Sequence, residues 1–266
     1  MAGTTTAQRG GQSRTGPPPA PGRLARLLRP RGRRLLVLVL VLTAALGGFS
    51  TWALYGSGWL RVEDVAVERD GGPRELTEAQ LLEAAAVPVG SPLASLDTGA
   101  VRDRLLAALP RLKSADVERS WPHGVALRVT EREAALLQAT GDGFSEVDED
   151  GVAFAEVPEA LPGVPVLELD LSDSPSARRF GEERVRGAAV SVVRALPDAV
   201  RGELRRVRAT SYDAITLELS GDRTVRWGSA ERAGEKADAL TAVLEAAPGA
   251  AHFDVSAPSV PAVSGP

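Results

Sequence analysis

The stretch WPHGVALRVTE, residues 121–131, decides how the middle of the chain folds. Within it, Val125, Leu127 and Val129 alternate with smaller or polar residues, a period of two that is typical of a strand with one buried face. The Trp-Pro-His-Gly segment ahead of them contains turn residues and follows a second strand expected over residues 115–119. The stretch therefore predicts two consecutive strands joined by a tight turn.

Upstream of this pair, the sequence predicts one strand and two helices. Residues 62–68 indicate a strand with alternating valines. A helix is expected over residues 77–86, where Thr77 and Gln80 have the spacing of a capping box. A second helix is expected over residues 97–109, beginning at either of its first two residues. The predicted order is strand, helix, helix, strand, strand.

Downstream, the pattern changes to mostly strands, and the fold class is α+β. The expected strands lie at residues 135–139, 144–147, 152–157, 164–171, 215–219, 224–227 and 253–255, with helices at 183–196 and, capped by Ser229, through residue 247. Residues 259–266 are expected to form a disordered tail because they are rich in Pro, Ser and Gly.

Residues 35–55, LLVLVLVLTAALGGFSTWALY, are uncharged and mostly apolar. As a helix they span about 31 Å, the thickness of a bilayer's hydrocarbon core. A cleaved signal peptide has a shorter apolar region, and the aromatic residues Phe49, Trp52 and Tyr55 suit a membrane–water interface. We therefore expect a transmembrane helix rather than a signal peptide or a buried core helix.

Charge divides the chain at this segment. Eight of the 31 basic residues lie before it with no acidic residue, which leaves 23 against 35 acidic ones beyond it, a net charge of −12. Short basic flanks stay in the cytoplasm, so residues 1–34 are expected to be a disordered cytoplasmic tail and the rest extracytoplasmic, a single-pass type II arrangement. The acidic outer part argues against nucleic acid as a partner.

No group of residues indicates catalysis, and we expect neither an enzyme nor a cofactor or metal site. The chain has no cysteine, which excludes thiol chemistry, and its two histidines, His123 and His252, lie far apart beside turn or strand-end residues. Serine-hydrolase and phosphate-loop motifs are absent. Glu146-x-Asp148-x-Asp150 resembles the start of a calcium loop, but the bidentate glutamate that such a loop needs is one position out of place.

Several short segments, taken in order, carry a resemblance to a known family. They are Trp121-Pro122 with Glu131-Arg132, the hairpin VDEDGVAF that contains Asp148 and Gly151, LPGVP at residues 161–165, VRWG at 225–228 followed by Lys236, and FDVSAP at 253–258. Together, behind a basic tail and one anchor, they are similar to the bacterial cell-division FtsQ (DivIB) family in its actinobacterial form. The resemblance implies a POTRA module at residues 60–132 and a β domain with two helices at 133–258.

What the family resemblance implies for function is a non-enzymatic scaffold of the division septum. Such a scaffold binds FtsB- and FtsL-type proteins and through them influences the septal peptidoglycan synthase pair FtsW and FtsI. In the family, a partner adds a strand to an exposed edge of the β domain. The corresponding residues here are the expected edge strand His252, Phe253, Asp254, Val255 and Ser256, the neighbouring Thr224, Val225, Arg226 and Trp227, and Lys236 on the adjoining helix.

Two other classes of function stay open at this point. A membrane-anchored cell-wall enzyme would need a catalytic cluster assembled by folding. A POTRA-type polypeptide-transport chaperone would normally carry several modules ahead of a barrel, and here the sequence indicates one module.

Overall fold

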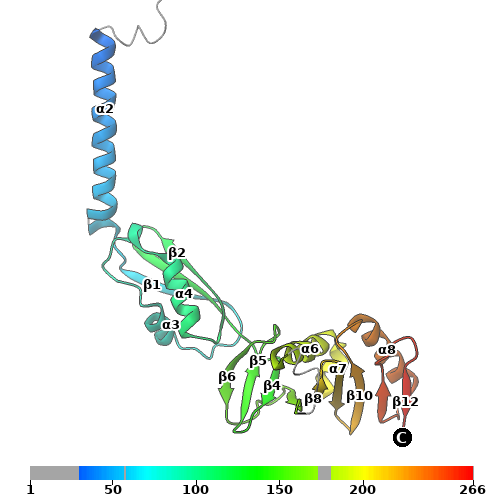
Figure 1. Ribbon diagram of the computed structural model, residues 1–266. Helices are drawn as coiled ribbons and strands as arrows, with labels where there is room; N and C mark the ends of the chain where they lie inside the picture. Colours follow the sequence, from blue (N-terminus) through cyan, green and yellow to red (C-terminus); the bar gives the residue numbers. More distant parts are fainter. Residues whose placement is uncertain (1–29, 57, 173–180, 266) are drawn as a thin grey trace, which may run out of the picture. The chain divides into compact units, whose positions relative to one another are not determined.

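The structure is a computed structural model that describes residues 30–56, 58–172 and 181–265 (Figure 1). The chain divides into two units, Met1–Leu60 and Arg61–Pro266. Most of the tail expected to be disordered, residues 1–29, lies outside the described residues.

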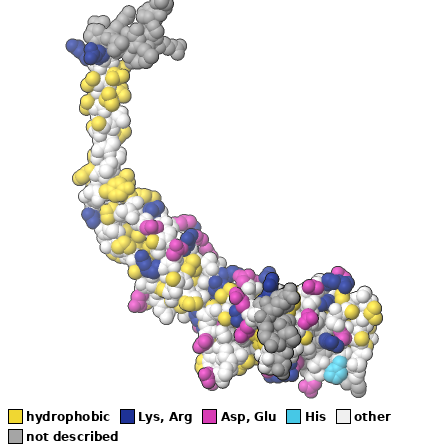
Figure 2. Space-filling view, in the orientation of Figure 1, with side chains coloured by type: hydrophobic (Ala, Val, Ile, Leu, Met, Phe, Trp, Pro, Cys, Tyr) yellow, Lys and Arg dark blue, Asp and Glu magenta, His cyan; other side chains and the backbone are white. Residues whose placement is uncertain are grey.

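The first unit contains an apolar helix, α2 (Pro30–Thr51), followed by a π-helical turn at Trp52–Gly56 and a 3-10 turn at Gly58–Leu60. Residues Gly32–Gly56 are long and apolar enough to cross a membrane, with a mean hydropathy of 2.1, and Figure 2 shows apolar side chains along the helix. The helix begins at Pro30, five residues before the predicted span. Proline is tolerated there because the N–H that it lacks is not needed in the first turn of a helix.

The second unit begins with the POTRA module, whose predicted order of elements is confirmed. The module contains β1 (Asp64–Gly71), α3 (Glu78–Ala85), a 3-10 turn (Leu93–Ser95), α4 (Thr98–Ala108), β2 (Leu112–Ser120) and β3 (Gly124–Glu131). The sheet order is β1-β3-β2, with β1 parallel and β2 antiparallel to β3. Both β1 and β2 are therefore outer strands of this sheet.

Local side-chain hydrogen bonds fix where the two helices of the POTRA module begin. The Thr77 hydroxyl accepts the Gln80 N–H, and the Gln80 side chain accepts the Thr77 N–H, which is the capping box expected from the sequence. The Asp97 carboxylate caps α4 through the Ala100 N–H at 3.0 Å. Both helices place leucines against the sheet, where Leu81 and Leu105 are fully buried.

In the described residues of the β domain there are a nine-stranded sheet and three helices. The strands are β4 (Leu136–Ala139), β5 (Phe144–Val147), β6 (Ala153–Val157), β7 (Val166–Leu169), β8 (Leu204–Ser211), β9 (Ala214–Leu219), β10 (Arg223–Gly228), β11 (His252–Asp254) and β12 (Ala262–Ser264). The helices are α6 (Glu182–Ala195), α7 (Asp198–Glu203) and α8 (Ala233–Ala246). The sheet order is β12-β11-β10-β9-β8-β7-β4-β5-β6, so β12 and β6 are its outer strands.

One face of this sheet forms the core of the domain. Alternate residues of β9, β10 and β11, among them Leu217, Trp227 and Phe253, are buried there. Helix α6 packs against β7, β8 and α8 over the same core. The opposite face of these strands carries polar and charged side chains. The alternation in the sequence therefore places the apolar residues on the core face and the polar residues on the solvent face of the sheet.

Four features of the β domain differ from the sequence predictions. Strand β8 and helix α7 were not expected, and β12 lies within the segment predicted to be a disordered tail, so that part of the prediction was wrong. Helix α8 begins at Ala233 and not at Ser229, because Arg232 adopts a left-handed conformation with φ of 55° just before it. Ser229 instead lies in the connection that precedes the helix.

Candidate partner-binding edge and the domain junction

Strand β12 is one of the two outer strands of the nine-stranded sheet, at the end opposite β6. It pairs antiparallel with β11 through His252 opposite Ser264, Phe253 opposite Val263 and Asp254 opposite Ala262. No other strand pairs with β12 within the described residues. The prediction that the β11 segment is the exposed edge was therefore wrong: β11 lies between β10 and β12, and residues 262–264 take its place at the edge.

Backbone alternation determines which groups of β12 point outward. On β11, the Ala251 carbonyl accepts the Thr224 N–H at 2.8 Å, and the Val255 N–H donates to the Arg226 carbonyl at 3.0 Å. The Ala251 carbonyl and the Val255 N–H thus point toward β10, and by alternation so do the backbone groups of residue 253, whereas those of residues 252 and 254 point toward β12. The backbone groups of Ser264 and Ala262, which lie opposite residues 252 and 254, point toward β11. The N–H and C=O of Val263, between them, therefore point away from the sheet.

A shallow groove of about 400 Å³ crosses the polar face of the sheet beside this edge. It is lined by two cross-strand rows: Thr224, His252 and Ser264 in one, and Thr216, Arg226, Asp254 and Ala262 in the next. The Thr224 hydroxyl and His252 Nδ1 share a hydrogen bond at 2.7 Å, and the Arg226 guanidinium lies 3.6 Å from the Asp254 carboxylate. The groove therefore offers hydrogen-bonding groups and charges of both signs next to an open strand.

Asp254 is held in its ionised form by its neighbours. Its carboxylate accepts hydrogen bonds from the Ser256 N–H at 2.9 Å and the Ser256 hydroxyl at 2.6 Å. Partial burial alone would raise the pKa of Asp254, but these hydrogen bonds and the Arg226 charge outweigh it, so its pKa lies below the ordinary value. A negative charge is thus fixed at the turn that leaves β11.

Four of the ten predicted contact residues lie in the hydrophobic core instead of on the surface. Val225, Trp227, Phe253 and Val255 are buried, and they pack in the hydrophobic core of the β domain. Their side chains cannot reach a partner in this arrangement, because side chains of successive strand residues point to opposite faces. The alternate predicted residues Thr224, Arg226, His252 and Asp254 line the groove, which Phe253 also borders, and Ser256 is exposed just beyond them.

Lys236 is also buried, although the sequence suggested a surface contact. Its ammonium group donates to the Ser229 carbonyl at 2.8 Å and lies 3.5 Å from the Ser229 hydroxyl. Burial lowers the pKa of Lys236, because a charged amine is disfavoured away from water. The side chain therefore ties the first turn of α8 to the connection that follows β10.

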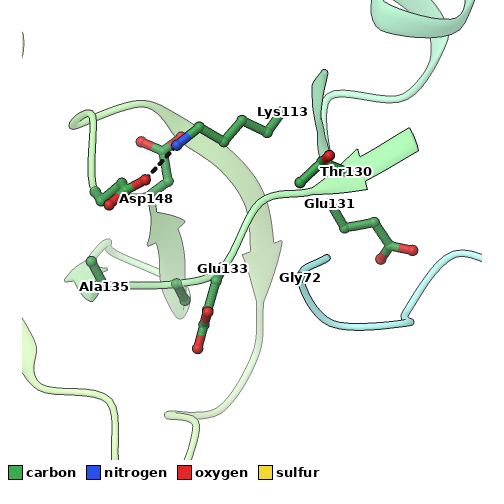
Figure 3. Close-up of a pocket in the computed structure, with 9 residues that line it drawn as sticks. Gly72, Lys113, Thr130, Glu131, Glu133, Ala135 and Asp148 are labelled. Carbon is green, nitrogen blue, oxygen red and sulfur yellow. Dashed lines mark hydrogen bonds and ion pairs between the residues drawn. The ribbon is translucent and has the colours of Figure 1, made fainter. Parts of the chain in front are cut away.

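A second group of charged residues joins the POTRA module to the β5–β6 hairpin. Arg132, directly after β3, pairs with Asp148, whose side chain is only 2% exposed. Arg111 pairs with Glu146 at 2.6 Å and also lies over the ring of Phe154 at 5.7 Å. In Figure 3, Lys113 extends toward the hairpin, where it pairs with Glu149. The acidic residues that resemble a calcium loop are thus engaged by arginines and a lysine.

The remaining family-motif residues shape the backbone around this junction. Glu131 accepts hydrogen bonds from Arg69 and from the N–H groups of Glu75 and Leu76, and in Figure 3 its side chain lies on the side of β3 that faces Gly72. Asp148 accepts the Asp150 and Val152 N–H groups and so closes its own turn. Gly151 sits in that turn with φ of 80°, where other residues are strained.

Trp121 and Pro122 form the exposed turn between β2 and β3 and make none of these junction contacts. Among the described residues, no three His, Asp or Glu side chains converge as they would around a metal ion. The contacts at the junction therefore account for Glu131, Arg132, Asp148 and Gly151, and they do not account for Trp121 and Pro122.

Comparisons with known proteins identify the family. Residues 60–132 match the family described as POTRA domain, FtsQ-type, and residues 135–256 match Cell division protein FtsQ/DivIB, C-terminal. A cell division protein FtsQ from Streptomyces collinus is 52% identical over 271 residues, which is 100% of both chains. The chain belongs to the FtsQ family. FtsQ from Streptomyces coelicolor is 50% identical over the same lengths, and FtsQ from Mycolicibacterium smegmatis is 36% identical over 88% of this chain and 66% of that protein.

Within this FtsQ-family chain, sequence reasoning missed the residues of the edge itself, Ala262, Val263 and Ser264. They form a very short strand between Pro261 and Gly265, in a segment whose composition is typical of disorder. The only local signal is one valine between two small residues, and it is too weak to predict a strand.

Proposed function

We propose that this FtsQ-family protein is a non-enzymatic scaffold of the division septum that binds FtsB- and FtsL-type partners. The partner adds a strand to the outer side of β12 by pairing with the backbone of Val263. Through these partners, the protein influences septal peptidoglycan synthesis by FtsW and FtsI. Its N-terminus lies in the cytoplasm and its POTRA module and β domain lie outside, with the protein enriched at the division site.

The observation that carries this proposal is the single-sided pairing of β12 next to a polar groove. An outer strand presents backbone donors and acceptors that a second extended chain can satisfy, and neighbouring side chains then select the partner. Thr224, His252 and Arg226 are available for that selection, because they line the groove. The orientation is supported by the basic residues before the span and the acidic excess after it.

Substitution of Val263 tests the docking edge directly. The Val263→Pro variant loses the outward N–H while the hydrogen bonds between β11 and β12 remain. Val263→Ala is the matched control, because it removes most of the side chain but keeps the N–H. We expect Val263→Pro to weaken binding of an FtsB-type partner to the full-length protein by at least about tenfold, about 1.4 kcal/mol, and Val263→Ala to change it far less.

Equal partner affinity for the wild-type and Val263→Pro proteins would show that β12 is not the docking edge. The outer strands β1 and β2 of the POTRA module would then be the next candidates, since both are edges of their sheet. Val255→Pro is not a suitable test, because the Val255 N–H donates to the Arg226 carbonyl inside the sheet. That variant would disrupt the fold itself.

A further inference from the structure

Two apolar loop tips are exposed at one end of the POTRA module. Val89, in the loop between α3 and the 3-10 turn, is 67% exposed, and Trp121, in the turn between β2 and β3, is 52% exposed. A small depression of about 270 Å³, lined only by Val65, Leu82, Val87 and Val89, adjoins the first tip. Large apolar side chains at two separate loop tips are not explained by the core of the module.

Both tips are fixed to the segment that enters the module from the membrane span. On the Val89 side, the Gly90 N–H donates to the Val62 carbonyl at 2.8 Å, and the Val62 N–H donates to the Ser91 carbonyl at 2.9 Å. The Arg61 guanidinium donates to the Gly90 carbonyl at 2.6 Å. These three hydrogen bonds hold the loop against residues 61–62.

Trp121 is held on the same segment by the β2–β3 turn. The Glu63 N–H donates to the His123 carbonyl at 2.8 Å, and Asp64 is paired with Gly124 at the start of the β1–β3 ladder. His123 Nδ1 also lies 3.9 Å from the Glu63 carboxylate. The two tips thus flank the first residues of the module.

Chain connectivity keeps this segment close to the bilayer. The candidate span ends at Gly56, so Arg61 is at most about 18 Å of extended chain beyond it. The interfacial layer of a bilayer is itself about 5–8 Å deep on each side. Any partly folded connection brings the entering segment nearer than this limit.

We propose that the Val89 and Trp121 tips seat in the interfacial layer of the membrane and hold the POTRA module against the lipid surface. Tryptophan favours this layer because its ring is apolar while its N–H can hydrogen-bond. The positive charge of Arg61 is offset by the neighbouring Glu63 and Asp64. The contact is therefore apolar and aromatic, and it does not require anionic lipids.

The absence of cysteine allows a site-specific test in the full-length protein. Val89→Cys is labelled with a polarity-sensitive fluorophore, and the protein is placed in nanodiscs of zwitterionic lipid with and without headgroup spin label. Val260→Cys, at a valine that is 76% exposed in the β domain, is the matched control. We expect the spin label to quench the probe at position 89 several-fold more than the probe at position 260.

Trp121→Ser in the Val89→Cys background tests whether both tips act together. We expect it to lower the quenching at position 89, whereas Val152→Ser, at an exposed valine of the β domain, leaves it unchanged. Thermal unfolding confirms that each variant is folded, since these side chains are on the surface. Replacing part of the lipid with an anionic one should leave the quenching unaltered.

Equal quenching at positions 89 and 260 in folded protein would overturn the proposal and leave a protein partner as the occupant of this surface. Unchanged quenching in Trp121→Ser would remove Trp121 from the contact. Quenching that appears only with anionic lipid would overturn the apolar mode of binding. None of these outcomes depends on whether β12 binds a division partner.

Discussion

The two ends of the nine-stranded sheet are built in opposite ways. At the β5–β6 end, Asp148 and Glu146 are buried, and each is paired with an arginine of the POTRA module. At the β12 end, the polar side chains are exposed or half-buried, and the outer strand is paired on one side only. A charge that is buried with its partner fixes the arrangement of the chain, whereas an exposed polar group beside an open strand remains free for binding.

The largest difference in stability between the two ends is expected when a buried charge is removed at the β5–β6 end. We expect Asp148→Ala to lower the free energy of unfolding by about 3–5 kcal/mol, because it leaves the Arg132 charge and two turn N–H groups without their acceptor. Arg128→Ala, which breaks only exposed ion pairs with Glu68 and Glu118, is the control and should lower the free energy of unfolding far less. Urea unfolding measures both, and similar losses in the two variants would contradict the distinction.

An intermediate effect is expected for Lys236, which lies near the open end but is buried. Lys236→Ala removes the hydrogen bond to the Ser229 carbonyl and the packing of the side-chain stem, so we expect a loss of about 1–3 kcal/mol in stability. Partner affinity, measured at a temperature where the variant is folded, should be unchanged. A large loss of affinity without a loss of stability would place Lys236 in the binding surface after all.

The smallest effect is expected from Asp254 at the open end. Because its folded-state pKa lies below the ordinary value, the ionised carboxylate stabilises the fold above that ordinary pKa, and this contribution is lost as the pH falls toward the folded-state pKa. The side chain is partly exposed, so we expect at most about 1 kcal/mol. Asp254→Asn should therefore be less stable than wild type at neutral pH, with a difference that shrinks below about pH 4. A constant difference across this range would exclude the linkage.

Local signals allowed much of the fold to be predicted from the sequence. The capping box of Thr77 and Gln80 depends on residues three positions apart and was found as expected, and the Asp97 cap lies at one of the two positions expected for the start of α4. Alternation over residues 215–219 and 224–227 likewise predicted β9 and β10. These features are decided by neighbours in the chain, which a sequence displays.

Features that depend on distant partners were missed. Strand β8 contains Arg205, Arg206 and Arg208, which hide its alternation, and two of them pair with Glu168 of β7 and Glu218 of β9. Those partners are identified only after the strands are aligned. Strand β12 has the same origin, since its three residues are ordered by pairing with β11 and not by their own propensity.

Only part of the candidate site could be predicted from the sequence, because the rest also depends on distant partners. The segment that contains it was located by resemblance, and alternation could separate the groove residues Thr224 and Arg226 from the core residues Val225 and Trp227. The sequence could not show that a later strand covers β11, because that requires a turn between residues 255 and 262 to bring the chain back. Edge strands are a property of the whole sheet.

The two lysines of the chain, Lys113 and Lys236, are both poor targets for amine-directed chemistry, for opposite reasons. Hydrogen bonds to Glu149 and Asp150 raise the pKa of Lys113 and keep its amine protonated, so it is a weak nucleophile at neutral pH. Lys236 has a lowered pKa but is enclosed by the protein. Crosslinkers that require free amines will therefore leave the β12 edge unmarked even when a partner occupies it, and carboxylate-directed or photoactivated reagents are the appropriate choice for mapping this surface.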